Sequence, residues 1–388
     1  MVTTILKDKK KIIAFIIWSI ICSLFVFKYS FRVSFPVALF STAFFNIAVS
    51  TTLWLCSKKN IYISNSAWLY LFGGITIFSI VIFQIIPVQN IRVDRWEMIQ
   101  IFWDAVHQGI YPYAVHSPEG NYPGPMPIYF LLSYPFYLIQ EIGWMSILAI
   151  WLLYFYIKNR KITKEKNTLI FILILSSITI YYEIITRSTI LFNSIIFLLY
   201  FLNLKDLEKQ SKSKFYANAI FGGIIFSTRN IFIIPMILWG MKIIFSKQIS
   251  FLKFTNWCLC FLLSFAITFI PLIAFDSALF LQYNPFITQG EMLIPFKHII
   301  IFIIATFLIP IILRKKFDVI FLTTLLFFAI ISYHVVYSIL NIGITAFLYC
   351  GADISYYIFC FPFILEILLR KEYDQEQNNN SCYASLQC

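Results

Sequence analysis

A few charged residues in this sequence have the types that phosphate and hydroxyl chemistry requires. Asp94 and Glu97 lie near the start of the polar segment 88–126, and Arg187 and Arg229 lie at the ends of later apolar runs. A guanidinium binds a phosphate through paired hydrogen bonds, and a carboxylate accepts the proton of a hydroxyl. These residues predict a membrane-face pocket that holds a lipid phosphate and activates a hydroxyl. For each arginine, snorkelling to lipid head groups is the alternative.

The elements that must position these residues are helices in a membrane. Of 388 residues, 60% are hydrophobic and 12% charged, and the mean hydropathy is +0.81. This composition excludes a soluble enzyme, a disordered protein and a disulfide scaffold. It predicts an all-α polytopic membrane protein, because a spanning helix needs ~20 apolar residues. Twelve runs are candidate spans: 12–28, 36–56, 67–87, 127–157, 168–186, 188–204, 215–228, 230–246, 254–275, 297–313, 317–340 and 353–369.

The positions of the basic residues predict the orientation of the chain. With the N-terminus in the cytoplasm, 23 of the 30 Lys and Arg residues fall in cytoplasmic segments, as the positive-inside rule requires. We therefore expect cytoplasmic termini and an outer segment 88–126. The same bias accounts for most of the net charge of +12 without a nucleic-acid partner. The outer segments hold Lys28, Arg32, Arg92, Arg95, Arg187, Arg229 and Lys297.

The outer segment 88–126 is too structured for a simple connector. Its apolar residues at helical spacing predict an amphipathic helix in the membrane interface, which Gly109 can end. Two Tyr-Pro elbows then lead the chain back to the membrane. Long loops of this kind are usually functional or disordered, and the aromatic content argues against disorder. The apolar face comprises Trp96, Ile99, Phe102, Trp103 and Val106.

This segment resembles the GT-C fold of polyprenol-phosphate-sugar-dependent glycosyltransferases, the mannosyltransferase-like membrane class. In that family an early acidic residue is followed by an amphipathic helix, a Gly-x-x-x-Tyr motif and a Tyr-Pro-Pro motif that opens an apolar span. Here Gly124 stands in place of the second proline. The likeness covers about 88–246, and the residues that carry it are Asp94, Gly109, Tyr111-Pro112-Tyr113, Tyr122-Pro123-Gly124-Pro125, Asn193, Gly222-Gly223 and Arg229.

The resemblance implies inverting transfer of a sugar from a polyprenyl-phosphate donor, with Asp94 as general base. Helix capping is the alternative for Asp94. The donor phosphate of such an enzyme needs cations, and the resemblance implies that these are Arg187, Arg229 and Arg95. Glu97 would bind a sugar hydroxyl or replace Asp94 as base, and the simplest partner of Glu183 is Arg187, one turn on. Further substrate-binding candidates, with exposed-surface or interfacial roles as alternatives, are Asp104, His107, Tyr111, Tyr113, Tyr122 and Asn193.

The expected enzyme would use no evident cofactor beyond its lipid-linked donor, and its partners would be membrane lipid and a glycan or glycolipid acceptor. No Asp-x-Asp or His-x-x-x-His motif points to a metal. We expect one transmembrane domain over 1–373, a disordered tail over 374–388 and a location in a bacterial inner membrane.

The sequence leaves two alternative functions open. One is an O-antigen-polymerase-like enzyme, whose large loop usually falls late in the chain. The other is a transporter, which would show mid-span charges and an internal repeat.

Overall fold

The structure is a computed structural model, and in the residues that it describes the chain is helical. Helices make up 78% of it, and the described part contains no strand. The predicted tail 374–388 lies outside the described residues. The described ranges are 8–91, 93–204, 207, 210–286, 288, 294–314, 316–349 and 353–370.

The chain is a polytopic membrane protein. Within the described ranges, six helices are long and apolar enough to cross a membrane, or eight spans if each bent helix pair is counted once. The straight candidates are α2 (Lys9–Phe31), α3 (Phe35–Lys58), α4 (Ala67–Ile85), α13 (Phe251–Ile267) with α14 (Ile270–Phe275), α17 (Phe296–Leu313) and α18 (Val319–Ile342). The bent pairs are α6 (Pro127–Leu138) with α7 (Gly143–Lys158), at 113°, and α8 (Lys164–Leu175) with α9 (Ile178–Ile185), at 42°.

Every predicted span coincides with one helix or a pair of helices, but only six to eight of the twelve are confirmed as long enough to cross a membrane. The helices at the other four predicted spans have 10 to 15 residues. At 1.5 Å per residue they are shorter than the ~30 Å hydrocarbon core of a bilayer. These shorter helices are α10 (Ile190–Leu202), α11 (Lys212–Phe226), α12 (Ile233–Ser246) after η3 (Asn230–Phe232), and α20 (Cys360–Leu369) after η4 (Ser355–Phe359).

Two neighbouring glycines let α11 approach its neighbours closely, Gly223 on the side of α13 and Gly222 on the side of α10. A Cβ atom on Gly223 would lie 2.0 Å from the Ser264 hydroxyl and 2.3 Å from the Phe261 carbonyl oxygen, and one on Gly222 would lie 1.9 Å from the Tyr200 hydroxyl. Small residues at a helix crossing allow such close packing inside a membrane. The Gly-Gly pair therefore has a packing function in this fold.

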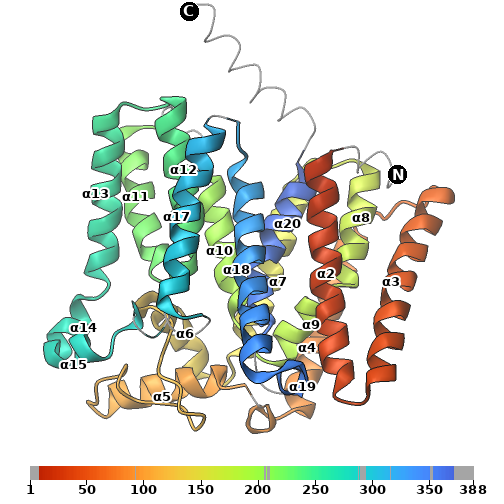
Figure 1. Cartoon of the computed structure of the whole chain (residues 1–388), viewed down its shortest axis with the longest axis horizontal. Coiled ribbons are helices and arrows are strands. Elements are labelled where there is room, and N and C mark those ends of the chain that lie inside the picture. The colour runs from red at the N-terminus through yellow and green to blue at the C-terminus, as the bar shows by residue number, and fades with distance from the viewer. Residues whose placement is uncertain are drawn as a thin grey trace, which may run out of the picture.

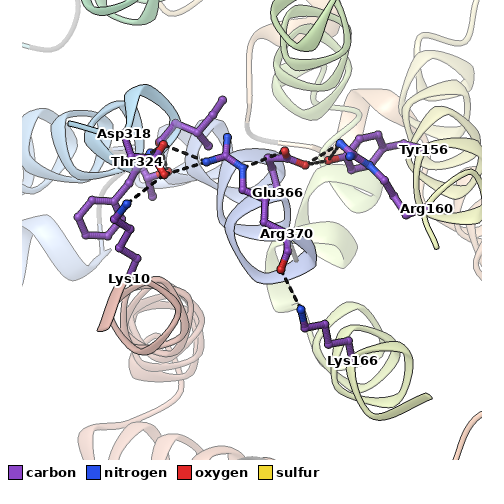
Figure 2. Close-up of polar contacts among 10 residues, drawn as sticks. Lys10, Tyr156, Arg160, Lys166, Asp318, Thr324, Glu366 and Arg370 are labelled. Carbon is purple, nitrogen blue, oxygen red and sulfur yellow. Dashed lines mark hydrogen bonds and ion pairs between the residues drawn. The ribbon is translucent and has the colours of Figure 1, made fainter. Parts of the chain in front are cut away.

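A buried ion network holds together the end of the bundle where α2 begins and α20 ends (Figure 2). Arg370 pairs with Asp318 at 2.8 Å and with Glu366 at 3.0 Å. Glu366, which is fully buried, also pairs with Arg160 at 2.8 Å, and Lys10 reaches Asp318 at 3.4 Å. The network thus joins α2, α7, α18 and α20 at one end.

Helix α5 (Arg95–His107) lies across the opposite end of the bundle (Figure 1). The predicted amphipathic helix is thereby confirmed, and its apolar residues Ile99 and Phe102 are buried. The ring of Phe102 stacks on Phe130 of α6 at 3.6 Å, and the Trp103 indole donates to the Phe130 carbonyl. Much of this apolar face therefore packs on α6. The other short elements at this end are η1 (Val88–Asn90), α15 (Ser277–Gln282) and α19 (Ile344–Tyr349).

Candidate active site

Asp94 stands at the start of α5 without capping it. Its side chain makes no hydrogen bond to the first turn of the helix. Instead its Oδ2 accepts a hydrogen bond from the side-chain amide of Asn121 at 2.7 Å and a long one from the Ser117 hydroxyl at 3.5 Å. The returning half of the same loop therefore orients this partly exposed carboxylate, and the helix-cap alternative is not supported.

Arg229 reaches this end because the chain before α6 is bonded to the chain after α11. The Ile128 amide donates to the Ser227 carbonyl at 3.0 Å. The guanidinium then lies over the ring of Tyr129, 4.8 Å from its centroid. Its Nε atom is buried without a hydrogen-bond partner, and no carboxylate of the described residues pairs with it. A cation with free donors is suited to bind an anionic group.

Arg95, the neighbour of Asp94, is occupied by the protein itself. Its guanidinium forms an ion pair with Asp353 and donates to the hydroxyls of Ser188 and Ser355. Burial by itself would lower the pKa of Arg95, but the Asp353 carboxylate outweighs burial and raises it. These bonds tie the start of α5 to the α9–α10 junction and to η4. The structure therefore gives Arg95 a positioning role rather than free donors for a phosphate.

Asp94 and Arg229 are linked by a short chain of contacts at this end of the bundle. Arg95, next to Asp94, donates to the Ser188 hydroxyl, and the following residue, Thr189, is hydrogen-bonded to Tyr129 at 2.9 Å. Arg229 lies over the ring of this tyrosine, although 135 positions separate Arg229 from Asp94 in the sequence. These contacts bring the two predicted residues to the same end of the bundle, and their joint role in one site stays a prediction.

Arg187 is placed differently from Arg229. Its side chain is fully buried, and one terminal nitrogen donates to the backbone carbonyls of Ile86 at 2.7 Å and Phe83 at 3.3 Å. Its Nε lies 3.5 Å from Glu141, in the elbow between α6 and α7. The residue itself has a positive φ of 50°. Arg187 thus joins the ends of three helices, and most of its donors are used inside the protein.

Glu183 does not form the predicted pair with Arg187, because Arg187 faces Glu141. The Glu183 carboxylate is fully buried, and one oxygen accepts the Leu191 amide at 2.7 Å, at the start of α10. Its other oxygen has no hydrogen-bond partner among the described residues, and the same is true of Asn193 Oδ1. The side chain of Asn193 is buried and donates to a backbone carbonyl of its own helix.

The remaining predicted residues fall into two groups. Asp104 accepts a hydrogen bond from Tyr137 at 2.6 Å, and His107 lies 3.4 Å from the same hydroxyl. At 1.5 Å per residue, Asp104 is ~15 Å along α5 from Asp94, so this pair lies apart from the Asp94 carboxylate. Glu97 is partly exposed and remains near Asp94.

The tyrosines of the loop differ in their exposure. Tyr111 and Tyr113 are buried, and their hydroxyls donate to the backbone carbonyls of Tyr283 and Pro125. They therefore fix the path of the loop. Tyr122, by contrast, is 38% exposed and is free to contact a ligand.

Sequence reasoning missed Asn121 and Ser117, which orient Asp94, and it missed Asp353, which forms an ion pair with Arg95.

Among the described residues, no group of three or more His, Cys, Asp or Glu side chains is arranged to hold a metal ion. No family model, curated protein or solved structure matches this chain.

Proposed function

We propose that this protein is an integral-membrane glycosyltransferase of the GT-C type. It would move a sugar from a polyprenyl-phosphate donor to a glycan or lipid-linked acceptor, with inversion at the anomeric carbon. The observation that carries the proposal is the chain of contacts through Ser188, Thr189 and Tyr129 that links an oriented carboxylate, Asp94, to an unpaired guanidinium, Arg229. A base and a phosphate-binding cation are the groups that this reaction needs.

In the proposed reaction, Asp94 takes the proton of the acceptor hydroxyl while the oxygen of that hydroxyl bonds to the anomeric carbon. The bond between that carbon and the phosphate oxygen breaks, and its electron pair leaves with the lipid phosphate. Arg229 stabilises the charge that develops on this phosphate. Asn121 and Ser117 hold Asp94 in position.

The proposal also assigns the two ends of the bundle. The basic network around Arg370 lies at the end where α2 begins and α20 ends (Figure 1), and the positive-inside rule assigns this end to the cytoplasm. The α5 end would then face the outside of a bacterial inner membrane. A lipid-linked donor would reach it from the outer leaflet.

The experiment that tests the proposal is an assay of the purified full-length protein with a panel of radiolabelled polyprenyl-phosphate sugars and a mixed glycolipid extract. We expect label from at least one donor to move into the acceptor fraction with inverted anomeric configuration. Movement of intact labelled lipid between leaflets without transfer would support a transporter instead. Joining of preassembled lipid-pyrophosphate oligosaccharides would support the polymerase reading. Either result would contradict the proposal.

A further inference from the structure

A cluster of aromatic side chains lies on the part of the loop that orients Asp94. Tyr122 is 38% exposed, and its ring lies 5.4 Å from that of Tyr283, just after α15, and 6.1 Å from that of His116. Tyr283 is fixed to the loop because its carbonyl accepts the hydroxyl of Tyr111 at 3.2 Å. Two segments far apart in the sequence thus form one surface, called here the aromatic platform and defined as His116, Tyr122 and Tyr283.

The aromatic platform is directly connected to the candidate base. Ser117 follows His116 and Asn121 precedes Tyr122, and both hydrogen-bond to Asp94. The turn between them is closed by the Ser117 amide, which donates to the Asn121 carbonyl at 2.9 Å. A ligand that rests on the platform is therefore held at a fixed position relative to the Asp94 carboxylate.

The charge beside the aromatic platform is negative. Glu119 lies in the turn between Ser117 and Asn121, which both hydrogen-bond to Asp94, and Glu97 lies in the first turn of α5 after Asp94. Desolvation and the carboxylates of Asp94 and Glu97 accordingly raise the pKa of Glu119. No described basic side chain forms an ion pair with any of them. This environment repels an anionic ligand and accepts hydrogen bonds from hydroxyl groups. Arg229, in contrast, supplies the unpaired positive charge of the site.

We propose that the aromatic platform is the acceptor subsite and that it binds an uncharged sugar ring. This inference rests on the proposed function, because only a transferase has an acceptor. One face of a sugar ring carries C–H groups that pack on the exposed ring of Tyr122, while its hydroxyls donate to the carboxylates of Glu97 and Glu119. The subsite would discriminate against sugars that carry a carboxylate or phosphate beside the reacting hydroxyl.

The test is a binding measurement that needs no donor. Saturation-transfer NMR on the full chain in nanodiscs would use the methyl glycosides of glucose, galactose, mannose and N-acetylglucosamine, with methyl glucuronide and methyl galacturonide as acidic counterparts. We expect at least one neutral glycoside to bind and the acidic pair to bind more weakly. Tyr122→Ala should weaken neutral binding by about 3- to 10-fold, and Tyr122→Phe should retain it. Tyr70→Ala, at a tyrosine on α4 that is 78% exposed, is the matched control and should change nothing.

Two results would overturn the subsite. One is that no neutral glycoside binds the wild-type protein, and the other is that Tyr122→Ala binds as well as Tyr122→Phe. Because binding is measured without donor, these failures are separate from a failure of the proposed function. Loss of platform binding with intact sugar transfer refutes only the subsite. Platform binding as expected, with no transfer from any lipid-phosphate sugar, refutes only the transferase.

Discussion

The guanidinium of Arg229 lies over the ring of Tyr129, 4.8 Å from its centroid, and no described carboxylate pairs with it. The guanidinium of Arg187 is instead enclosed by two backbone carbonyls and Glu141. Both arginines follow an apolar run, and the sequence predicts the same function for both. The Nε atoms of both are buried without a hydrogen-bond partner, but only Arg187 donates from its terminal nitrogens to backbone carbonyls. These surroundings separate Arg229, whose terminal nitrogens are free among the described residues, from Arg187, which supports the fold.

We therefore expect Arg229→Ala to impair use of the lipid-phosphate donor while the protein remains folded. Loss of charge-assisted hydrogen bonds to the phosphate, worth ~1.5–3 kcal/mol, corresponds to a reduction of kcat/KM for the donor by about 10- to 100-fold. Arg229→Lys should restore part of this loss, because it keeps the charge but not the fork. Steady-state kinetics with varied donor measure the effect, and unchanged donor kinetics in Arg229→Ala would favour snorkelling.

Arg187→Ala should act on stability instead. Removing this side chain leaves Glu141 and the Ile86 carbonyl without their partner, at a cost of ~3 kcal/mol or more in the free energy of unfolding. Thermal unfolding in detergent would show a lower midpoint for Arg187→Ala than for Arg229→Ala. A fully stable Arg187→Ala that has lost donor binding would contradict this assignment.

The ion network at the other end of the bundle predicts a second stability effect. Glu366 is fully buried between Arg160 and Arg370, so Glu366→Gln leaves Arg160 without its counter-charge and Arg370 with only that of Asp318 (Figure 2). Breaking a buried pair in this way costs ~3–5 kcal/mol. Lys164→Gln on α8, a charged and exposed position, is the matched control and should stay within ~0.5 kcal/mol of the wild type. Equal melting temperatures for the two variants would refute the role of the network.

The pairing of Asp353 with Arg95 predicts a dependence of stability on pH. Burial alone would raise the pKa of Asp353, but Arg95 and Ser355 lower it below the ordinary value of ~3.9. The pair therefore contributes stability that is fully present above about pH 4 and is lost as the pH falls through the lowered pKa. Thermal unfolding between pH 6 and pH 3 should show a steeper loss for wild type than for Asp353→Asn. Parallel curves would contradict the ion pair.

The sequence was sufficient for features that depend on local composition. Apolar runs locate the helices of the bundle, and the predicted span 127–157 is divided between Leu138, where α6 ends, and Gly143, where α7 begins. Run length does not reveal how a helix bends or stops, and twelve full spans are therefore not confirmed. A lone arginine also does not reveal what surrounds it, so Arg187 could not be distinguished from Arg229.

The hydrogen-bond partners of Asp94 could not be predicted from the sequence for a similar reason. Asn121 and Ser117 are ordinary polar loop residues, and they meet Asp94 only because the loop returns over the start of α5. Asp353 comes to Arg95 from the far end of the chain. Such contacts depend on tertiary packing, which a single sequence shows only through recurring motifs.

The most direct test of the account is the transfer rate of Asp94→Asn compared with Asp104→Asn. Both changes replace a carboxylate at α5, but Asp104 is bonded to Tyr137 and lies ~15 Å along the helix. With saturating donor and acceptor, we predict that Asp94→Asn lowers the rate by about 10²- to 10⁴-fold, the usual contribution of a general base. Asp104→Asn should stay within about threefold of wild type, and both variants should unfold at the wild-type temperature. Wild-type transfer by a folded Asp94→Asn protein would contradict the central claim.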